Sequence, residues 1–138
     1  MLAPVFLRAG AGEALRSAIS AEPDMHALII EDDGLISMAI EDVLRGCGFT
    51  SFDIAVSFDE AVAAASKQCP DLITSDVQLQ PGCGIDAVQT ICSSTPIPVI
   101  FITGRAHSAR SRMPQHPVLT KPFCTSDVQA AVRHAMKH

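Results

Sequence analysis

Four short apolar runs, each ending in polar residues, constrain the fold of this chain more than any other feature. They are LIIEDD at 28–33, ITSDVQ at 73–78, VIFITG at 99–104 and LTKPF at 119–123. A short apolar run bounded by polar or turn residues is typical of a buried parallel strand. Ligands of an open α/β sheet bind just outside the carboxyl ends of its strands. The polar ends of the four runs are therefore predicted to meet at one edge of a sheet.

The residues at these polar ends predict a site for a metal ion and a phosphoryl group. They are Glu31, Asp32, Asp33, Asp76, Thr103 and Lys121. Mg²⁺ prefers oxygen ligands and keeps several of its waters, so a few carboxylates are enough to bind it. Carboxylates held close together repel one another unless a cation lies among them, so the cluster itself favours a metal. We expect Glu31, Asp32 and Asp76 to be ligands, with Asp33 farther from the ion.

The same residues can support transfer of a phosphoryl group. A carboxylate is a competent nucleophile toward phosphorus, and aspartyl phosphate is a known type of covalent intermediate. Mg²⁺ and the ammonium of Lys121 would stabilise charge on the phosphoryl oxygens from two sides. The hydroxyl of Thr103 could bond to the new phosphoryl group, and Gly104 leaves the approach open. The Lys121–Pro122 peptide is a candidate cis bond that would direct the lysine toward the site.

The segments between the runs alternate between strand and helix patterns. Strands are predicted at 26–30, 52–56, 72–75, 98–102 and 118–120, and helices at 35–47, 57–67, 85–92 and from 125 onward. Ser57 and Glu60 predict a capping box, and Thr125 is predicted to cap the last helix. Pro114 and Pro117 limit any helix within 105–117 to about two turns. The pattern predicts an α/β fold of the (βα)5 type, with a parallel five-stranded sheet covered by helices on both faces.

Length and composition indicate one compact domain. The chain has 138 residues, of which 48% are hydrophobic and 18% are charged. Its formal net charge of −5 argues against non-specific binding to nucleic acid. No apolar run approaches the roughly 20 residues of a membrane span, and the start of the chain is a poor signal peptide. We expect neither nucleic acid nor a membrane as a partner.

The cysteines and histidines suggest no further site. The five cysteines lack CxxC spacing, which favours reduced thiols in a cytoplasmic protein over a zinc site. The five histidines show no ligand spacing, so each is expected at the surface.

Residues 1–24 differ from the rest of the chain. They contain a short helix-like segment at 12–19 and then a linker that includes Pro23 and two acids. Either a short docking helix or a poorly ordered extension would fit, and the extension is preferred. The predicted organisation is an N-terminal extension at 1–24 followed by a domain at 25–138.

From Met25 to about Met136, the ordered set of motifs resembles the receiver domain of two-component response regulators, the CheY-like superfamily. The resemblance implies a flavodoxin-like strand order of 2-1-3-4-5. It makes Asp76 the phosphoacceptor, with Glu31 and Asp32 as the metal-binding acids and the backbone carbonyl of Gln78 as a further ligand. Thr103 and Lys121 match the switch hydroxyl and the invariant lysine.

The chain departs from the receiver pattern at three places, one of which is a segment between Thr103 and Lys121 that is shorter than usual. Receivers commonly carry an aromatic residue three positions before the lysine, where this chain has Val118. The proline that usually follows the phosphoacceptor is displaced to Pro81. The absence of an aromatic residue at Val118 puts the aromatic half of the usual switch in doubt.

Three segments of the sequence most resemble the receivers of PhyR-type regulators of the general stress response and related single-domain receivers. These segments are LIIEDDGLISMAIEDVL, DVQL…GIDAV and PVIFIT…LTKPF. Residues 1–24 are too short for the sigma-factor-like domain that precedes the receiver in PhyR, so a stand-alone receiver is expected. It would take phosphate from a sensor histidine kinase or a phosphotransfer protein. Its output would be another protein that binds the 103–121 region.

Two further functions are alternatives to this switch. A phosphate-independent interaction module is the alternative, which the absent aromatic residue favours and the intact site opposes. A phosphohydrolase would need a second acid where Gln78 stands, so the chain is not expected to be an enzyme beyond its own phosphorylation and dephosphorylation. Arg105, Arg110 and Arg112 lie in the expected output region, where they are either solvated or face an acidic partner.

Overall fold

The computed structural model describes residues 24–79 and 81–137 of the chain. The strands are β1 (Met25–Ile30), β2 (Phe49–Ala55), β3 (Leu72–Ser75), β4 (Val99–Thr103) and β5 (Val118–Thr120). The helices are α2 (Gly34–Gly46), α3 (Phe58–Lys67), α4 (Gly84–Cys92), α5 (Ala106–Arg112) and α6 (Thr125–Met136). Apart from Asp24, the predicted extension at 1–24 lies outside the described residues. None of the described helices is long and apolar enough to cross a membrane.

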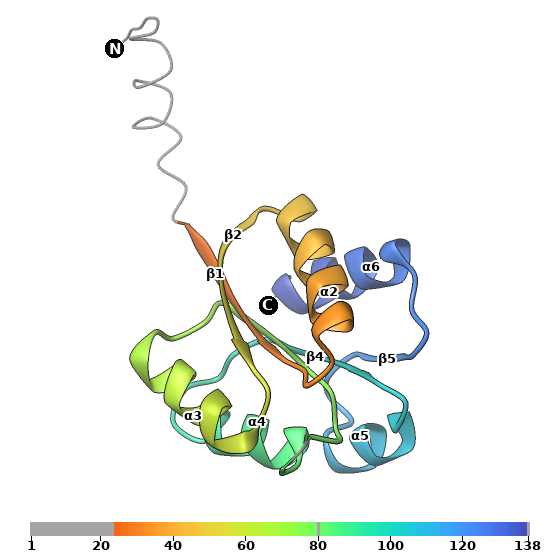
Figure 1. The fold of residues 1–138 in the computed structure, drawn as a ribbon. Helices are drawn as coiled ribbons and strands as arrows, with labels where there is room; N and C mark the ends of the chain where they lie inside the picture. The colour runs from red at the N-terminus through yellow and green to blue at the C-terminus, as the bar shows by residue number, and fades with distance from the viewer. Residues whose placement is uncertain (1–23, 80, 138) are drawn as a thin grey trace, which may run out of the picture.

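The five strands form one parallel sheet in the order β2-β1-β3-β4-β5. The α/β fold and the strand order predicted from the sequence are therefore confirmed. Helices α2 and α6 lie on one face of the sheet, and α3, α4 and α5 lie on the other (Figure 1).

The sheet has an apolar core on each face because alternate residues of its strands point in opposite directions. In β1, Leu28 and Ile30 belong to the core beneath α3, α4 and α5, while Ala27 and Ile29 belong to the core beneath α2 and α6. This burial on both faces explains why the central strands are continuous apolar runs without polar alternation.

Three local predictions differ from the structure. Strand β2 begins at Phe49, three residues earlier than predicted, because Gly48, with φ of 104°, turns the chain directly into pairing with β1. Thr125 is not a cap, since it is the first residue of α6 and Cys124 holds the capping position without a side-chain bond. The capping box is present, but Glu60 accepts from the backbone N–H of Val56 instead of Ser57.

The prediction of a surface position for His26 is wrong. This residue is 4% exposed at the start of β1. Its ring nitrogens lie 2.7 Å from Ser51 Oγ and 3.0 Å from Asp53 Oδ2, both on the adjacent strand β2. A histidine can be buried here because the neighbouring strand satisfies its polar atoms.

We expect Thr74→Val to stabilise the fold by about 1 kcal/mol. Thr74 lies in the middle of β3 with 1% exposure, and its hydroxyl has no hydrogen-bond partner within residues 24–79 and 81–137. Valine replaces this unsatisfied hydroxyl by a methyl group of similar size. Urea unfolding would measure the change. Thr74→Ser, which keeps the hydroxyl and loses the methyl group, should instead destabilise, and a Thr74→Val variant less stable than the parent would contradict the argument.

Candidate functional site

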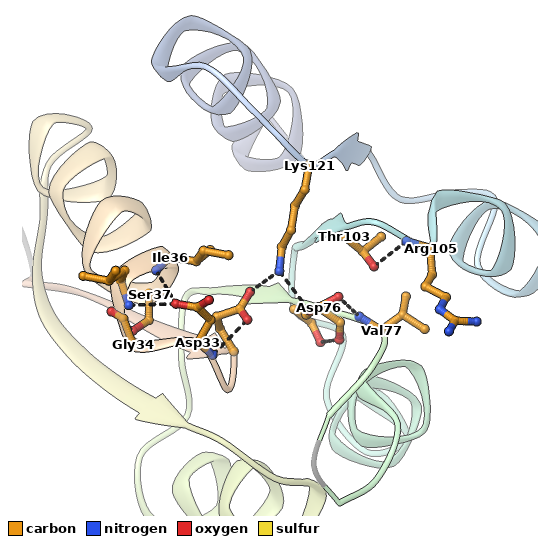
Figure 2. Close-up of polar contacts among 12 residues, drawn as sticks. Asp33, Gly34, Ile36, Ser37, Asp76, Val77, Thr103, Arg105 and Lys121 are labelled. Carbon is orange, nitrogen blue, oxygen red and sulfur yellow. Dashed lines mark hydrogen bonds and ion pairs between the residues drawn. The ribbon is translucent and has the colours of Figure 1, made fainter.

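The carboxyl ends of four strands bring the predicted site residues together. Glu31 directly follows β1, Asp76 follows β3, Thr103 ends β4 and Lys121 follows β5. Figure 2 shows the side chain of Lys121 reaching across this edge of the sheet toward Asp76. The predicted meeting of the polar ends at one sheet edge is therefore found.

The ammonium of Lys121 joins two buried carboxylates. Its Nζ atom lies 2.8 Å from Glu31 Oε1 and 2.9 Å from Asp76 Oδ2. Glu31 is 2% exposed and Asp76 is 9% exposed. Water screens such a triad poorly, so its attractions are stronger than those of surface ion pairs.

Burial and pairing shift the pKa of two members of this triad. Burial raises the pKa of Glu31 above its usual range, against the opposing effects of the Lys121 ammonium and the backbone N–H of Asp33. Burial acts to lower the pKa of Lys121, but its hydrogen bonds to Glu31 and Asp76 together with their charges raise it overall. The ammonium is therefore held in its charged form beside Asp76.

Carboxylate oxygens gather beside this triad in a way that suits a hard cation. Glu31, Asp32 and Asp76 can each offer an oxygen so that the three oxygens lie within 4.8 Å of one another. Asp32 is exposed while the other two are buried, so the group opens toward solvent on one side. Oxygen donors that are few and open to water are the donor set that Mg²⁺ takes in proteins.

Asp33 fixes the backbone at the start of α2 and is not one of the three clustered carboxylates. Its Oδ1 accepts hydrogen bonds from the backbone N–H groups of Leu35 and Ile36, at 2.9 and 3.2 Å, and so caps α2. Its own backbone N–H donates to Glu31 Oε2 at 3.1 Å. Asp33 therefore has a role that the sequence did not reveal: it caps α2 and, through its backbone N–H, positions the carboxylate of Glu31.

The loop after Asp76 is folded tightly onto the start of α4. The backbone N–H of Val77 donates to Asp76 Oδ1 at 2.7 Å, and the N–H of Gly84 donates to the carbonyl of Val77 at 2.7 Å. Gln78 is exposed and forms an antiparallel bridge with Cys83. These contacts fix the backbone that carries the candidate phosphoacceptor.

Gly84 is a site residue for which sequence reasoning gave no role. A Cβ atom at this position would overlap the backbone carbonyl of Asp76 and the hydroxyl of Ser75, and would lie 2.9 Å from the carbonyl carbon of Asp76. The only available signal was a glycine directly before the first apolar residue of a helix. The absence of a side chain lets α4 begin directly against the residue that carries the nucleophile.

Thr103 and Val118 lie on the β4–β5 side of the site. Thr103 is fully buried, and its Oγ1 accepts a hydrogen bond from the backbone N–H of Arg105 at 2.9 Å (Figure 2). Val118 is half-buried and pairs with Phe101 across the sheet. The Lys121–Pro122 bond is cis, as predicted.

The three arginines of the expected output region differ in their contacts. Arg105 and Arg110 are exposed on or beside α5. Arg112 instead donates to Asp86 Oδ1 at 2.7 Å and to Gln89 Oε1 at 3.0 Å, both on α4. Its charge is therefore matched within the domain, which leaves Arg105 and Arg110 as the candidates for an acidic partner.

Comparisons with known proteins agree with this geometry. A family model described as the response regulator receiver domain matches residues 27–133. The phyllosphere-induced regulator PhyR of Methylorubrum extorquens is 36% identical over 124 residues, which are 86% of this chain and 46% of that protein. The chain thus spans about half the length of this relative.

Two solved structures of PhyR proteins are also similar. The receiver domain of PhyR from Erythrobacter litoralis is 37% identical with a TM-score of 0.71, over 83% of this chain and 91% of that chain. A mutant of the anti-anti-sigma factor PhyR from Bartonella quintana is 35% identical with a TM-score of 0.71, over 92% of this chain and 54% of that chain.

Proposed function

The chain belongs to the response regulator receiver domain family, and from this premise we propose that it is a signalling switch phosphorylated on Asp76. The observation that carries the proposal is the triad in which Lys121 Nζ lies within 2.9 Å of Asp76 Oδ2 and 2.8 Å of Glu31 Oε1. A nucleophile, a cation and a neighbouring acid are thereby assembled directly after the carboxyl ends of three different strands.

The reaction is a transfer between two bonds to phosphorus. A carboxylate oxygen of Asp76 attacks the phosphorus of a phosphohistidine on a histidine kinase or phosphotransfer protein. A P–O bond to Asp76 forms as the P–N bond of the donor breaks, and the leaving imidazole keeps the electron pair. The Lys121 ammonium, already beside Asp76, stabilises the charge on the phosphoryl oxygens.

Mg²⁺ is the proposed cofactor of this reaction. Glu31, Asp32 and Asp76 would hold it, together with the backbone carbonyl of Gln78. When bound, it supplies positive charge that offsets the oxygens of the carboxylates and of the phosphoryl group. The gathered carboxylate oxygens support this assignment.

The output is proposed to be a change in affinity for a protein partner. Thr103 would exchange its hydrogen bond from Arg105 for one to the phosphoryl group, and the 103–121 region would rearrange with it. The exposed Arg105 and Arg110 favour an acidic partner surface. Because a relative is described as an anti-anti-sigma factor, a protein of sigma-factor regulation in the general stress response is the candidate partner. A cytoplasmic location fits the five free cysteines.

Intact-mass spectrometry after incubation with acetyl phosphate tests the proposal. We expect one phosphoryl adduct that forms only with Mg²⁺. It should not form when EDTA is present or in the Asp76→Asn variant. Asp42→Asn is the matched control, because Asp42 is exposed on α2, away from the site, and its replacement should leave the adduct unchanged. If no adduct forms with acetyl phosphate or with candidate kinases, the chain is instead a phosphate-independent interaction module.

A further inference from the structure

Strand β2 is a long edge of the sheet. It is the outermost strand (Figure 1), and within residues 24–79 and 81–137 no strand pairs with its outer side. It has seven residues, whereas the opposite edge strand, β5, has only three. An unpaired edge of this length presents a row of backbone donors and acceptors to other strands. A further strand could therefore add to the sheet beside β2.

Alternation along β2 identifies the backbone groups that face outward. The carbonyl of Ala55 accepts from the N–H of Glu31 at 2.9 Å, so it faces inward, toward β1. Successive residues of a strand direct their backbone groups to opposite sides. The N–H and C=O groups of Phe52 and Ile54 therefore face away from β1. These are the groups available to a further strand.

Strand β2 lacks most of the features that prevent pairing at an edge. Edge strands are commonly protected by lysine, by proline, by a bulge or by a charged side chain. β2 contains no lysine or proline, and its irregular register with β1 is confined to its amino end. Its one charged side chain, Asp53, already lies 3.0 Å from the ring of the buried His26. Ile54 and the following Val56 instead expose apolar surface, at 44% and 39%.

A second copy of β2 is the strand that fits this edge. Antiparallel pairing about a two-fold axis at Phe52 would let the two Phe52 residues exchange both backbone hydrogen bonds. Ile54 of each copy would then face Thr50 of the other, and Ser51 would lie opposite Asp53, a hydroxyl beside a carboxylate. An axis at Asp53 would instead place two carboxylates directly opposite each other, which is destabilising. Charge therefore favours the register centred on Phe52.

Helix α2, which packs beside β2, carries matched charge and exposed apolar side chains near this edge. Arg45 lies over the ring of Phe52, with its guanidinium carbon 4.7 Å from the ring centre. It is paired with Glu41 at 2.7 Å, so the surface next to the axis carries no unmatched charge from this pair. Leu35 and Met38 of the same helix are strongly exposed. Apolar surface thus gathers on the two elements that a second copy would approach.

From these observations we propose that two copies of this chain dimerise by antiparallel pairing of their β2 strands, centred on Phe52. The two five-stranded sheets then form one continuous sheet. Both copies use the same surface, so association stops at the dimer. Asp76 follows β3, two strands away from the junction, so each phosphorylation site stays outside the contact. The inference goes beyond the proposed phosphorylation, because it assigns an interaction surface and its partner.

Hydrogen exchange reports the pairing at the atoms that form it. Exchange of single backbone N–H groups is followed by NMR in the full chain at several protein concentrations, without a phosphodonor. The N–H groups of Phe52 and Ile54 should exchange about tenfold more slowly when about nine chains in ten are dimeric, because only the monomeric fraction exchanges. Thr120 is the control on the opposite edge. Its N–H faces outward there, because the N–H of the next residue, Lys121, bonds inward to β4, and its rate should not change.

Substitution at the edge gives a second test, in which analytical ultracentrifugation measures the dissociation constant of the dimer. Ile54→Lys places a charge beside the junction and should weaken dimerisation at least about tenfold, since the change occurs twice in each dimer. Thr120→Lys makes a matched change at an exposed position of β5 and should leave the constant unchanged. Urea unfolding checks that both variants remain folded.

Three results would overturn the proposal. The mass of a single chain at every concentration up to about 1 mM would show that β2 binds no second copy. Slowed exchange at Thr120, with Phe52 and Ile54 unchanged, would assign the dimer to β5. An Ile54→Lys protein that dimerises as tightly as the parent would place the contact outside β2. None of these results depends on phosphorylation of Asp76, so this test and that of the proposed function fail separately.

Discussion

Gly84→Ala is expected to destabilise the fold by at least about 3 kcal/mol and to impair phosphorylation at the same time. The added Cβ atom would overlap the carbonyl oxygen of Asp76 and the hydroxyl of Ser75. Neither group can yield easily, because Ser75 is buried and donates to the Asp76 carbonyl at 2.8 Å. Relief therefore requires a shift of the loop or of the start of α4.

Movement of that loop would reach the site directly. Gly84 N–H bonds to the carbonyl of Val77, whose own N–H holds Asp76 Oδ1. A displaced α4 would thus change the orientation of the Asp76 carboxylate and the position of the Gln78 backbone. We expect the yield of phosphoryl adduct in the folded fraction to fall together with stability.

Gly46→Ala is the matched control for this prediction. Gly46 is the last residue of α2, and apart from its chain neighbours and the backbone of its own helix no atom of the described residues lies within 4 Å of the position its Cβ would take. Alanine there should be neutral or stabilise by about 0.5–1 kcal/mol. Urea unfolding and intact mass would be measured for both variants. A Gly84→Ala protein within about 1 kcal/mol of the parent would show that the loop is softer than its contacts indicate.

The sequence was sufficient to predict the sheet and the residues at its edge. Apolar runs identified the buried strands, and the polar residue after each run identified the ligand edge, because parallel strands all present their carboxyl ends on one side. Glu31, Asp76 and Lys121 could be grouped in this way although Lys121 is 90 residues from Glu31. This inference needs only the topology, with no knowledge of side-chain packing.

Features that depend on packing could not be predicted in the same way. The need for glycine at 84 follows from how closely the chain returns to Asp76, which no local pattern records. The burial of His26 depends on β2, which begins beside Met25 and presents Ser51 and Asp53. Likewise, the pairing of Arg112 with Asp86 joins α5 to α4 across 26 positions.

Lys121→Met is expected to lower the rate of phosphoryl transfer by at least about 100-fold, because it removes the cation that faces the phosphoryl oxygens. It should also destabilise the metal-free fold by about 3 kcal/mol at neutral pH, since Glu31 and Asp76 then lose their shared counter-charge. Lys67→Met is the matched control, since Lys67 is exposed at the end of α3 and should change stability by no more than about 0.5 kcal/mol.

The pH and Mg²⁺ dependence of the Lys121→Met variant separates the loss of charge from a loss of packing. Burial already raises the pKa of Glu31, and loss of the ammonium removes interactions that lower it. A carboxyl with a raised pKa in the folded state binds more protons there than when unfolded, so the variant's stability should fall as the pH rises through that pKa. The deficit relative to the parent should therefore shrink on acidification. It should also shrink with Mg²⁺, which neutralises the same carboxylates. Urea unfolding at several pH values, with and without Mg²⁺, measures both effects, and a deficit that neither condition reduces would mean that Lys121 acts through packing alone.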